Sequence, residues 1–144
     1  MFMKIAIVCV VAFCALAILR LNAAEQKESK SAAGGAGTRY FEMRTYHCNP
    51  GKLDALNKRF RDHTNRLFIK HGIDLVGYWE PVDQKDTLTY ILAYPSKEAR
   101  DASWKAFQSD PDWIKAKADS EKDGVLVNKV DQVFMTPTDY SPIK

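Results

Sequence analysis

The chain has 144 residues, with 21 basic and 18 acidic side chains and a formal net charge of +3. This length suits one domain, and a hydrophobic fraction of 46% is ordinary for a globular protein. The two signs of charge are well mixed along the chain, which excludes a nucleic-acid-binding protein that depends on a clustered basic face.

Residues 1–24 have the features of a secretory signal peptide. Lys4 precedes an uncharged, mostly apolar run from Ile5 to Leu19, and the small residues Ala23 and Ala24 follow. Arg20 ends the apolar run before it reaches the roughly 20 residues that span a membrane. The sequence therefore predicts a cleaved signal and export to the periplasm or the extracellular space. The alternative is an uncleaved segment that anchors the protein.

Residues 25–38 contain no large apolar side chain and are rich in Lys, Glu, Ser, Ala and Gly, which predicts a flexible linker. The folded domain is expected over residues 39–140. Cleavage of the signal would remove Cys9 and Cys14 and leave Cys48 without an intrachain disulfide partner.

The first expected strand, Tyr40–His47, has two different faces because successive side chains of a strand alternate. One face carries Tyr40, Glu42, Arg44 and Tyr46, and the other carries Phe41, Met43 and Thr45. The first face mixes charge with aromatic surface, so it either meets solvent or lines something polar.

A helix is expected next, with Asn49 as its N-cap and Pro50 in its first position. Its buried stripe, at helical spacing, is Leu53, Leu56, Phe60, Thr64 and Leu67, with Arg59 among the charged residues of the exposed side. Gly72 suits the left-handed position that ends the helix.

The second half of the domain contains three strands and two helices. Strands Ile73–Glu80 and Thr87–Tyr94 are joined by a short polar segment, so they are expected to pair antiparallel. Ser96 is expected to cap a helix to about Ser109 that buries Ala99, Ser103 and Ala106, with Trp104 and Phe107 at its flank. Asp110 is expected to cap a short helix to about Ser120, and the last strand is Leu126–Thr136.

This β-α-β-β-α-β order predicts an α+β, ferredoxin-like fold. Right-handed crossovers give a four-stranded antiparallel sheet with both helices on one face. The other face would leave a large apolar patch in a monomer, so we expect a homodimer in which a second copy covers it. We place the charged face of the first strand there, where Glu42 and Arg44 would be paired or would line a cavity.

Several segments together resemble the NIPSNAP family. They are Tyr40-Phe-Glu-Met-Arg-Thr-Tyr, Pro50-Gly-Lys-Leu, Arg59-Phe-Arg-Asp-His-Thr, Leu67-Phe-Ile-Lys-His-Gly, Val76-Gly-Tyr-Trp and Ser103-Trp-Lys-Ala-Phe-Gln-Ser-Asp-Pro-Asp-Trp. The resemblance covers roughly residues 39–140 and implies the dimeric α+β barrel. It implies little about function: animal relatives are mitochondrial, whereas this chain carries a secretory-type signal. Distant relatives of the barrel include haem-degrading and antibiotic-biosynthesis mono-oxygenases, and a shared fold does not establish a shared reaction.

The candidate ligand-binding residues are Arg44, Glu42, Tyr46, Tyr78 and Trp79. The first three share a strand face, and the alternative for its charges is a cross-strand salt bridge. Gly77 precedes the two aromatics of the next strand, where it leaves room for a bulge or a ligand. Tyr78 and Trp79 must point to opposite faces, one under a helix and one into the barrel.

His63 is the candidate catalytic residue, as a pocket acid or base or as a haem ligand; the alternative is a histidine at the rim of the helix. His71 lies in the last turn of the first helix, where a cation interacts favourably with the helix dipole, so we expect it to cap that helix. The three histidines are widely spaced and no cysteine pair accompanies them, so we predict no metal site. No cofactor motif is evident.

Three functional hypotheses follow. The first is an exported homodimer that binds a small hydrophobic or anionic ligand without catalysis. The second is an enzyme of the barrel superfamily, an oxygenase or isomerase type with a hydrophobic, for example haem-like, substrate, in which His63 is the acid, base or haem ligand and Arg44 positions an anionic group. The third is a protein-interaction module of the cell envelope. Whether the protein is an enzyme is left open, and no nucleic-acid partner is expected.

Overall fold

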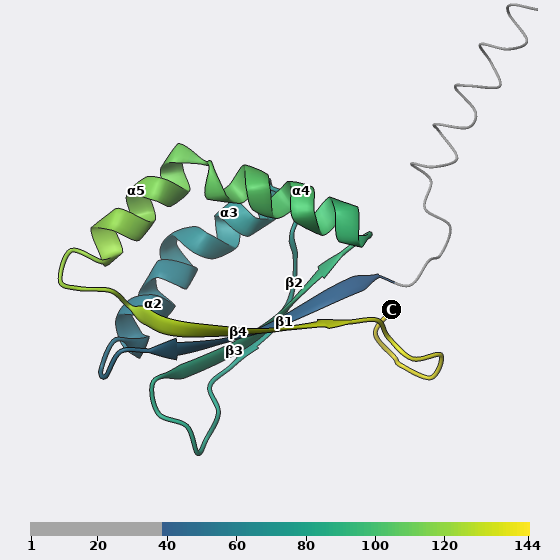
Figure 1. Cartoon of the computed structure of the whole chain (residues 1–144), viewed down its shortest axis with the longest axis horizontal. Helices are drawn as coiled ribbons and strands as arrows, with labels where there is room; N and C mark the ends of the chain where they lie inside the picture. The colour runs from purple at the N-terminus through teal and green to yellow at the C-terminus, as the bar shows by residue number, and fades with distance from the viewer. Residues whose placement is uncertain (1–38) are drawn as a thin grey trace, which may run out of the picture. The chain divides into compact units, whose positions relative to one another are not determined.

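The computed structural model describes residues 39–144, and the predicted signal peptide and linker lie outside them. The elements are β1 (Tyr40–Cys48), α2 (Leu53–Arg59), η1 (Phe60–Thr64), α3 (Asn65–Lys70), β2 (Asp74–Trp79), β3 (Thr87–Tyr94), α4 (Lys97–Gln108), α5 (Pro111–Ser120) and β4 (Val127–Met135). The helices lie over one face of the sheet (Figure 1). Within the described range, no helix has the length and apolar character needed to cross a membrane.

The four strands form one antiparallel sheet in the order β2-β3-β1-β4. This confirms the predicted α+β architecture. The register places Glu42 opposite Leu92 of β3 and Phe134 of β4, and Arg44 opposite Tyr90 and Gln132. Directly opposed residues share a sheet face. The charged face of β1 is therefore continuous with the apolar face of β3.

The first helical segment differs from the single helix that the sequence predicts. Asn49 does not cap it; Gly51 has φ +73°, and the helix begins only at Leu53. The middle of the segment is a π-helical turn, η1, in which the backbone N–H of Asn65 donates to the carbonyl of Phe60. Thr64 Oγ1 donates to the carbonyl of Arg59 at 3.3 Å. The end was predicted correctly, because Gly72 has φ +71°.

The π turn changes which side chains are buried. Leu56, Phe60, Thr64 and Leu67 are buried as predicted, but Arg59 is also buried, at 4% exposure. A π turn adds a residue to the helical repeat, so two consecutive side chains can face the sheet. The prediction that Arg59 covers the exposed side was wrong for this reason.

Both expected caps of the second helical pair are present. The side chain of Ser96 accepts from the backbone N–H of Ala99 at the start of α4, and Asp110 accepts from Asp112 at the start of α5. The buried face of α4 was predicted one position out of phase. Trp104 and Phe107 are its buried residues, whereas Ala106 is exposed. Large aromatic rings bury more apolar area than alanine, and they decide which face is covered.

The core fills the space between the sheet and the helices. From β3 it includes Leu88, Tyr90, Leu92 and Tyr94, as the alternation predicts, and they pack against aromatic residues of the helices, including Phe60, Phe68, Trp104 and Phe107. Tyr46 also packs against this core, and Glu42 is fully buried. The face of β1 that carries Glu42 and Arg44 is thus covered by helices. Our assignment of this face to a dimer partner was wrong.

No helix of residues 39–144 covers the opposite sheet face, and we call it the open face. Its apolar part consists of Phe41, Met43, Val76, Ile91, Val133 and Met135, and the C-terminal residues Pro137 and Ile143 line a groove with it. Its polar part includes Thr45 and Thr89, whose hydroxyls are 3.2 Å apart, and the pair of His47 and Asp131 at 2.8 Å. The apolar part remains the surface that a second copy would cover.

Asp110 joins the end of α3 to the start of α5. Its carboxylate accepts from Lys70 Nζ and from His71 Nε2, each at 2.7 Å. Hydrogen bonds from Lys70 and His71 outweigh desolvation and lower the pKa of Asp110. His71 thus stabilises a helix end, as expected, but it does so by its hydrogen bond to the Asp110 carboxylate.

We therefore expect Asp110→Ala to lower Tm by several degrees, because α5 loses its N-cap and the link to α3. The unfolded pKa exceeds the folded pKa, so the stabilisation by Asp110 is complete above about pH 4 and is lost as the pH falls through the folded value. Thermal unfolding followed by circular dichroism at pH 7 measures the change. Asp112→Ala, on the exposed side of the same turn, is the matched control; equal Tm values for the two variants would contradict this role.

Candidate ligand-binding pocket

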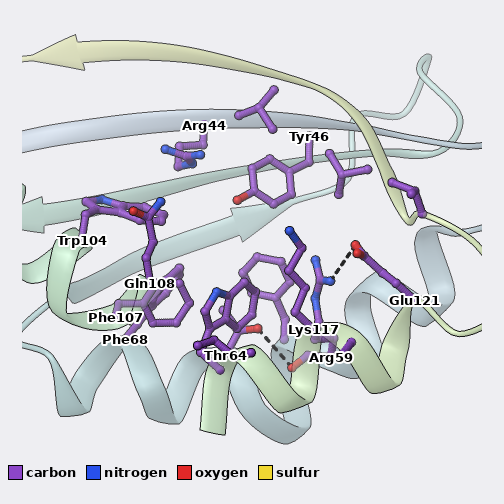
Figure 2. A pocket seen from close by; sticks show the side chains of 17 residues that line it. Arg44, Tyr46, Arg59, Thr64, Phe68, Trp104, Phe107, Gln108, Lys117 and Glu121 are labelled. Atoms are coloured by element: carbon purple, nitrogen blue, oxygen red, sulfur yellow. Dashed lines mark hydrogen bonds and ion pairs between the residues drawn. The ribbon is translucent and has the colours of Figure 1, made fainter. Parts of the chain in front are cut away.

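A cavity of about 810 Å³ lies between the sheet and the helices (Figure 2). It is lined by side chains from β1, α2, η1, α3, α4, α5, β4 and the segment that leads into β4. Val125 and Val130 line it while remaining 56% and 40% exposed, so the cavity opens to solvent beside β4. Its volume is in the range of small-molecule sites.

The inner wall of the cavity is aromatic. Phe60, Phe68, Trp104, Phe107 and Trp113 line it, and neighbouring rings are packed with centroids 4.5–6.3 Å apart. The π turn contributes directly, because it places both Arg59 and Phe60 on the wall. Such a wall suits a ligand with a flat or apolar body.

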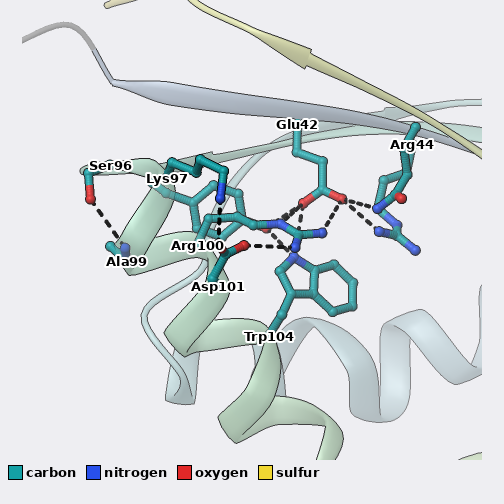
Figure 3. Close-up of polar contacts among 10 residues, drawn as sticks. Glu42, Arg44, Ser96, Lys97, Ala99, Arg100, Asp101 and Trp104 are labelled. Carbon is teal, nitrogen blue, oxygen red and sulfur yellow. Dashed lines mark hydrogen bonds and ion pairs between the residues drawn. The ribbon is translucent and has the colours of Figure 1, made fainter.

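Behind the cavity, Glu42 accepts hydrogen bonds from five side chains on four elements, β1, β3, β4 and α4 (Figure 3). The donors are Arg44 at 2.6 Å, Gln132 at 2.6 Å, Arg100 at 2.9 and 3.0 Å, Trp104 at 2.9 Å and Tyr94 at 3.2 Å. Arg44 and Gln132 flank Glu42 on the sheet with Tyr94, and the other two come from α4. The carboxylate therefore ties α4 to the sheet and fixes two residues of the cavity wall, Arg44 and Trp104.

Electrostatics keeps this carboxylate ionised. Burial alone would raise the pKa of Glu42, but hydrogen bonds and charge from Arg100 and Arg44 outweigh it, and the pKa lies below its ordinary value. Burial likewise opposes the charge of Arg44, yet the neighbouring Tyr46, Tyr90 and Glu42 raise the pKa of the guanidinium. One buried carboxylate thus faces two permanent cations, Arg44 and Arg100.

Glu42, Arg44 and Arg100 form a cluster with one surplus positive charge, and Arg44 is the member of this cluster that lines the cavity. Its guanidinium stacks 4.4 Å from the centroid of the Trp104 ring, and its side chain is 11% exposed. Its Nε is buried and has no hydrogen-bond partner within residues 39–144. A positively charged, incompletely bonded group in a mostly apolar cavity favours an anionic ligand.

The other end of the cavity contains a second group of charges. Arg59 Nη1 donates to Glu121 at 3.1 Å and to Ser120 at 3.2 Å, and Lys117 of α5 points into the same end. The guanidinium of Arg59 lies 5.2 Å from the centroid of Trp113, and its Nε is buried without a hydrogen-bond partner in the described part of the chain.

Of the predicted ligand-binding residues, the cavity brings together Arg44 and Tyr46, with Glu42 directly behind. Tyr78 packs under the helices, where its hydroxyl donates to Asn65 at 2.9 Å, and it lines a small cleft on another side of η1. Trp79 is 52% exposed on the open face. The register of β2 shifts between Leu75 and Gly77, so of the two roles considered for Gly77, a bulge or room for a ligand, the bulge is present. The indole of Trp79 fills the space above the glycine, 2.7 Å from where a Cβ would stand.

The predicted catalytic residue lies elsewhere. His63 is exposed on the outer side of η1 and lines a small cleft against α5 with Lys58 and Asp62. The main cavity does not include it. Within residues 39–144, no group of three or more His, Cys, Asp or Glu side chains is arranged to hold a metal ion.

Sequence reasoning missed four residues of the site. Arg100 and Gln132 complete the bonding of Glu42, whereas Arg59 and Lys117 form the far end of the cavity. The only available signal was the sequence Arg59-Phe60, a long cation next to a buried aromatic residue. It is interpretable only once the π turn is known.

Comparison with known proteins agrees with this fold. A family model described as NIPSNAP matches residues 41–142. Similar solved structures include a NIPSNAP family protein from Agrobacterium tumefaciens (24% identity, TM-score 0.65, covering 74% of this chain and 94% of that one) and a NIPSNAP domain protein from Burkholderia xenovorans (22%, 0.63, 72% and 98%). A putative antibiotic biosynthesis monooxygenase from Chloroflexus aurantiacus is similar at 19% identity and TM-score 0.52, covering 74% and 99%. No curated protein matches the chain.

Proposed function

The chain belongs to the NIPSNAP family, and from this premise we propose that it binds a small anionic molecule with an apolar body in the cavity beside Arg44. The observation that carries the proposal is the combination of an aromatic cavity with a buried, incompletely bonded guanidinium on its wall. Glu42 is the positioning residue that holds Arg44 and Trp104 in place.

Catalysis has weaker support than binding. The similar monooxygenase shares the fold, but a sequence identity below 25% does not show that the two proteins catalyse the same reaction. An oxygenase or isomerase, haem-related or not, would need a proton-transferring group at the cavity, and His63 lies outside it. Among the described residues, Tyr46, Lys117 and Glu121 line the cavity and belong to types that transfer protons, but Glu121 is held in an ion pair with Arg59 and no histidine lines the cavity. The structure therefore supports a binding protein better than the enzyme or the envelope interaction module.

We also propose export and dimerisation. Export is supported by the signal-like residues 1–24. Dimerisation is supported by the apolar part of the open face, where Val133 is 46% exposed in a single copy. Mass measurement of the secreted protein would reveal cleavage near Ala24.

A charge within the apolar part of the open face should prevent dimerisation. We expect the wild-type protein to be a dimer and Val133→Glu to be a monomer at micromolar concentration, because the carboxylate would be buried without a partner. Size-exclusion chromatography with light scattering measures the mass. The matched control is Val82→Glu, since Val82 is fully exposed in the β2–β3 loop. A wild-type monomer, or a dimer unaffected by Val133→Glu, would contradict this assignment.

Three probes of equal chain length test the proposed ligand class. We expect octanoate to raise the Tm of the purified protein, and 1-octanol and octylammonium to do so much less, because Arg44 interacts favourably only with the anion. Equal shifts with all three would indicate non-specific apolar binding and would contradict the proposal.

A further inference from the structure

The two charged groups of the cavity lie at opposite ends of it. Figure 2 shows Arg44 with Trp104 and Gln108 at one end, and Arg59 with Lys117 and Glu121 at the other. A second, shallower pocket supports this division. It continues outward from Arg44, Trp104 and Gln108 and includes none of the residues of the second group.

Each end carries one more positive than negative charge. At the first end, Glu42 faces both Arg44 and Arg100. At the second end, Glu121 pairs with Arg59 at 3.1 Å and leaves Lys117 without an ion-pair partner among the described residues. Arg100 also pairs with Asp101, which pairs in turn with Lys97, so counting these two side chains leaves the surplus of one positive charge unchanged.

The bonding of both buried guanidiniums is incomplete in the same way. Arg44 and Arg59 each donate from Nη1 to a carboxylate, and each has a buried Nε with no hydrogen-bond partner among the residues that the structure describes. Arg59 is only 4% exposed, so its charge is poorly solvated on a cavity wall. Buried cations of this kind are stabilised by an additional anion.

From these observations we infer that the ligand carries two anionic groups separated by an apolar body, one group for Arg44 and one for Arg59 and Lys117. This inference rests on the proposed function and adds the second anionic group. The aromatic wall between the two ends accounts for the apolar body.

The test uses α,ω-dicarboxylates from octanedioate to hexadecanedioate, each compared with the monocarboxylate of the same length by isothermal titration calorimetry. At the length that matches the separation of the two ends, we expect the diacid to bind about tenfold more tightly. Lys117→Met should reduce this ratio to about twofold or less, and Lys117→Arg should preserve it. Lys115→Met is the matched control on the same helix, because Lys115 pairs with Asp119 outside the cavity.

The outcomes separate the two proposals. Equal affinities of diacid and monoacid at every length, with both weakened by Arg44→Met, would overturn the second anionic group alone. A diacid preference that Lys117→Met leaves intact would overturn the role of this end of the cavity. Monoacid binding that is absent, or indifferent to Arg44→Met, would overturn the proposed function and this inference with it.

Discussion

Replacing Glu42 with glutamine is expected to lower the free energy of unfolding by about 3–5 kcal/mol, the usual cost of breaking a buried ion pair by removing one partner. Glutamine keeps the size of the side chain but removes the charge that two guanidiniums share. Its amide accepts at only one terminal atom, so the donors at one oxygen lose their acceptor: either Arg44 and Gln132 at Oε1 or Trp104 and Tyr94 at Oε2.

Urea unfolding followed by circular dichroism measures this loss. Glu98→Gln is the matched control, because Glu98 is exposed on α4 and the change should stay within about 0.5 kcal/mol. Equal stability of the two variants would show that the Glu42 cluster does not hold α4 to the sheet.

The same substitution should change the acid sensitivity of the protein. Glu42 has a lower pKa in the folded state than in the unfolded chain, where it is about 4.3, so its stabilisation is complete above that pH. It is lost as the pH falls through the folded pKa. Between about pH 5 and pH 3 the wild-type protein should therefore lose more unfolding free energy than Glu42→Gln. Parallel curves would contradict the lowered pKa.

The second large effect is expected for ligand binding. Arg44→Met should weaken octanoate binding about ten- to hundredfold, because a hydrogen-bonded charge in the cavity contributes about 1.5–3 kcal/mol. The fold should persist, since Glu42 keeps its bonds from Arg100, Trp104, Tyr94 and Gln132 and methionine fills the apolar space beside the indole.

Calorimetric titration of octanoate measures the change in Kd. Arg39→Met is the matched control. Arg39 pairs with Asp74 away from the cavity, so this variant should bind octanoate like the wild-type protein. An equal loss in both variants would point to a general effect of net charge and would contradict a specific role of Arg44.

Local patterns were sufficient to predict most of the fold. The alternation of Leu88, Tyr90, Leu92 and Tyr94 correctly identified the buried face of β3. Ser96, Asp110 and Gly72 correctly marked the ends of helices because capping depends on adjacent residues. These features require no knowledge of distant contacts.

The site depended on information that local patterns lack. Alternation shows that Glu42 and Arg44 share a face, but it does not show which face the helices cover. That choice follows from the pairing of β1 with the apolar face of β3. The burial of Arg59 depends on a π turn for which the sequence gives no periodic signal, and Arg100 reaches Glu42 across 58 residues of chain.

Native mass spectrometry of the protein purified from an exporting host tests the central claim most directly, because it retains a bound ligand. We predict bound mass that is released on denaturation as an anion, absent from Arg44→Met and retained by Arg39→Met. Bound mass that is neutral or cationic, or that Arg44→Met retains in full, would contradict an anion site at Arg44.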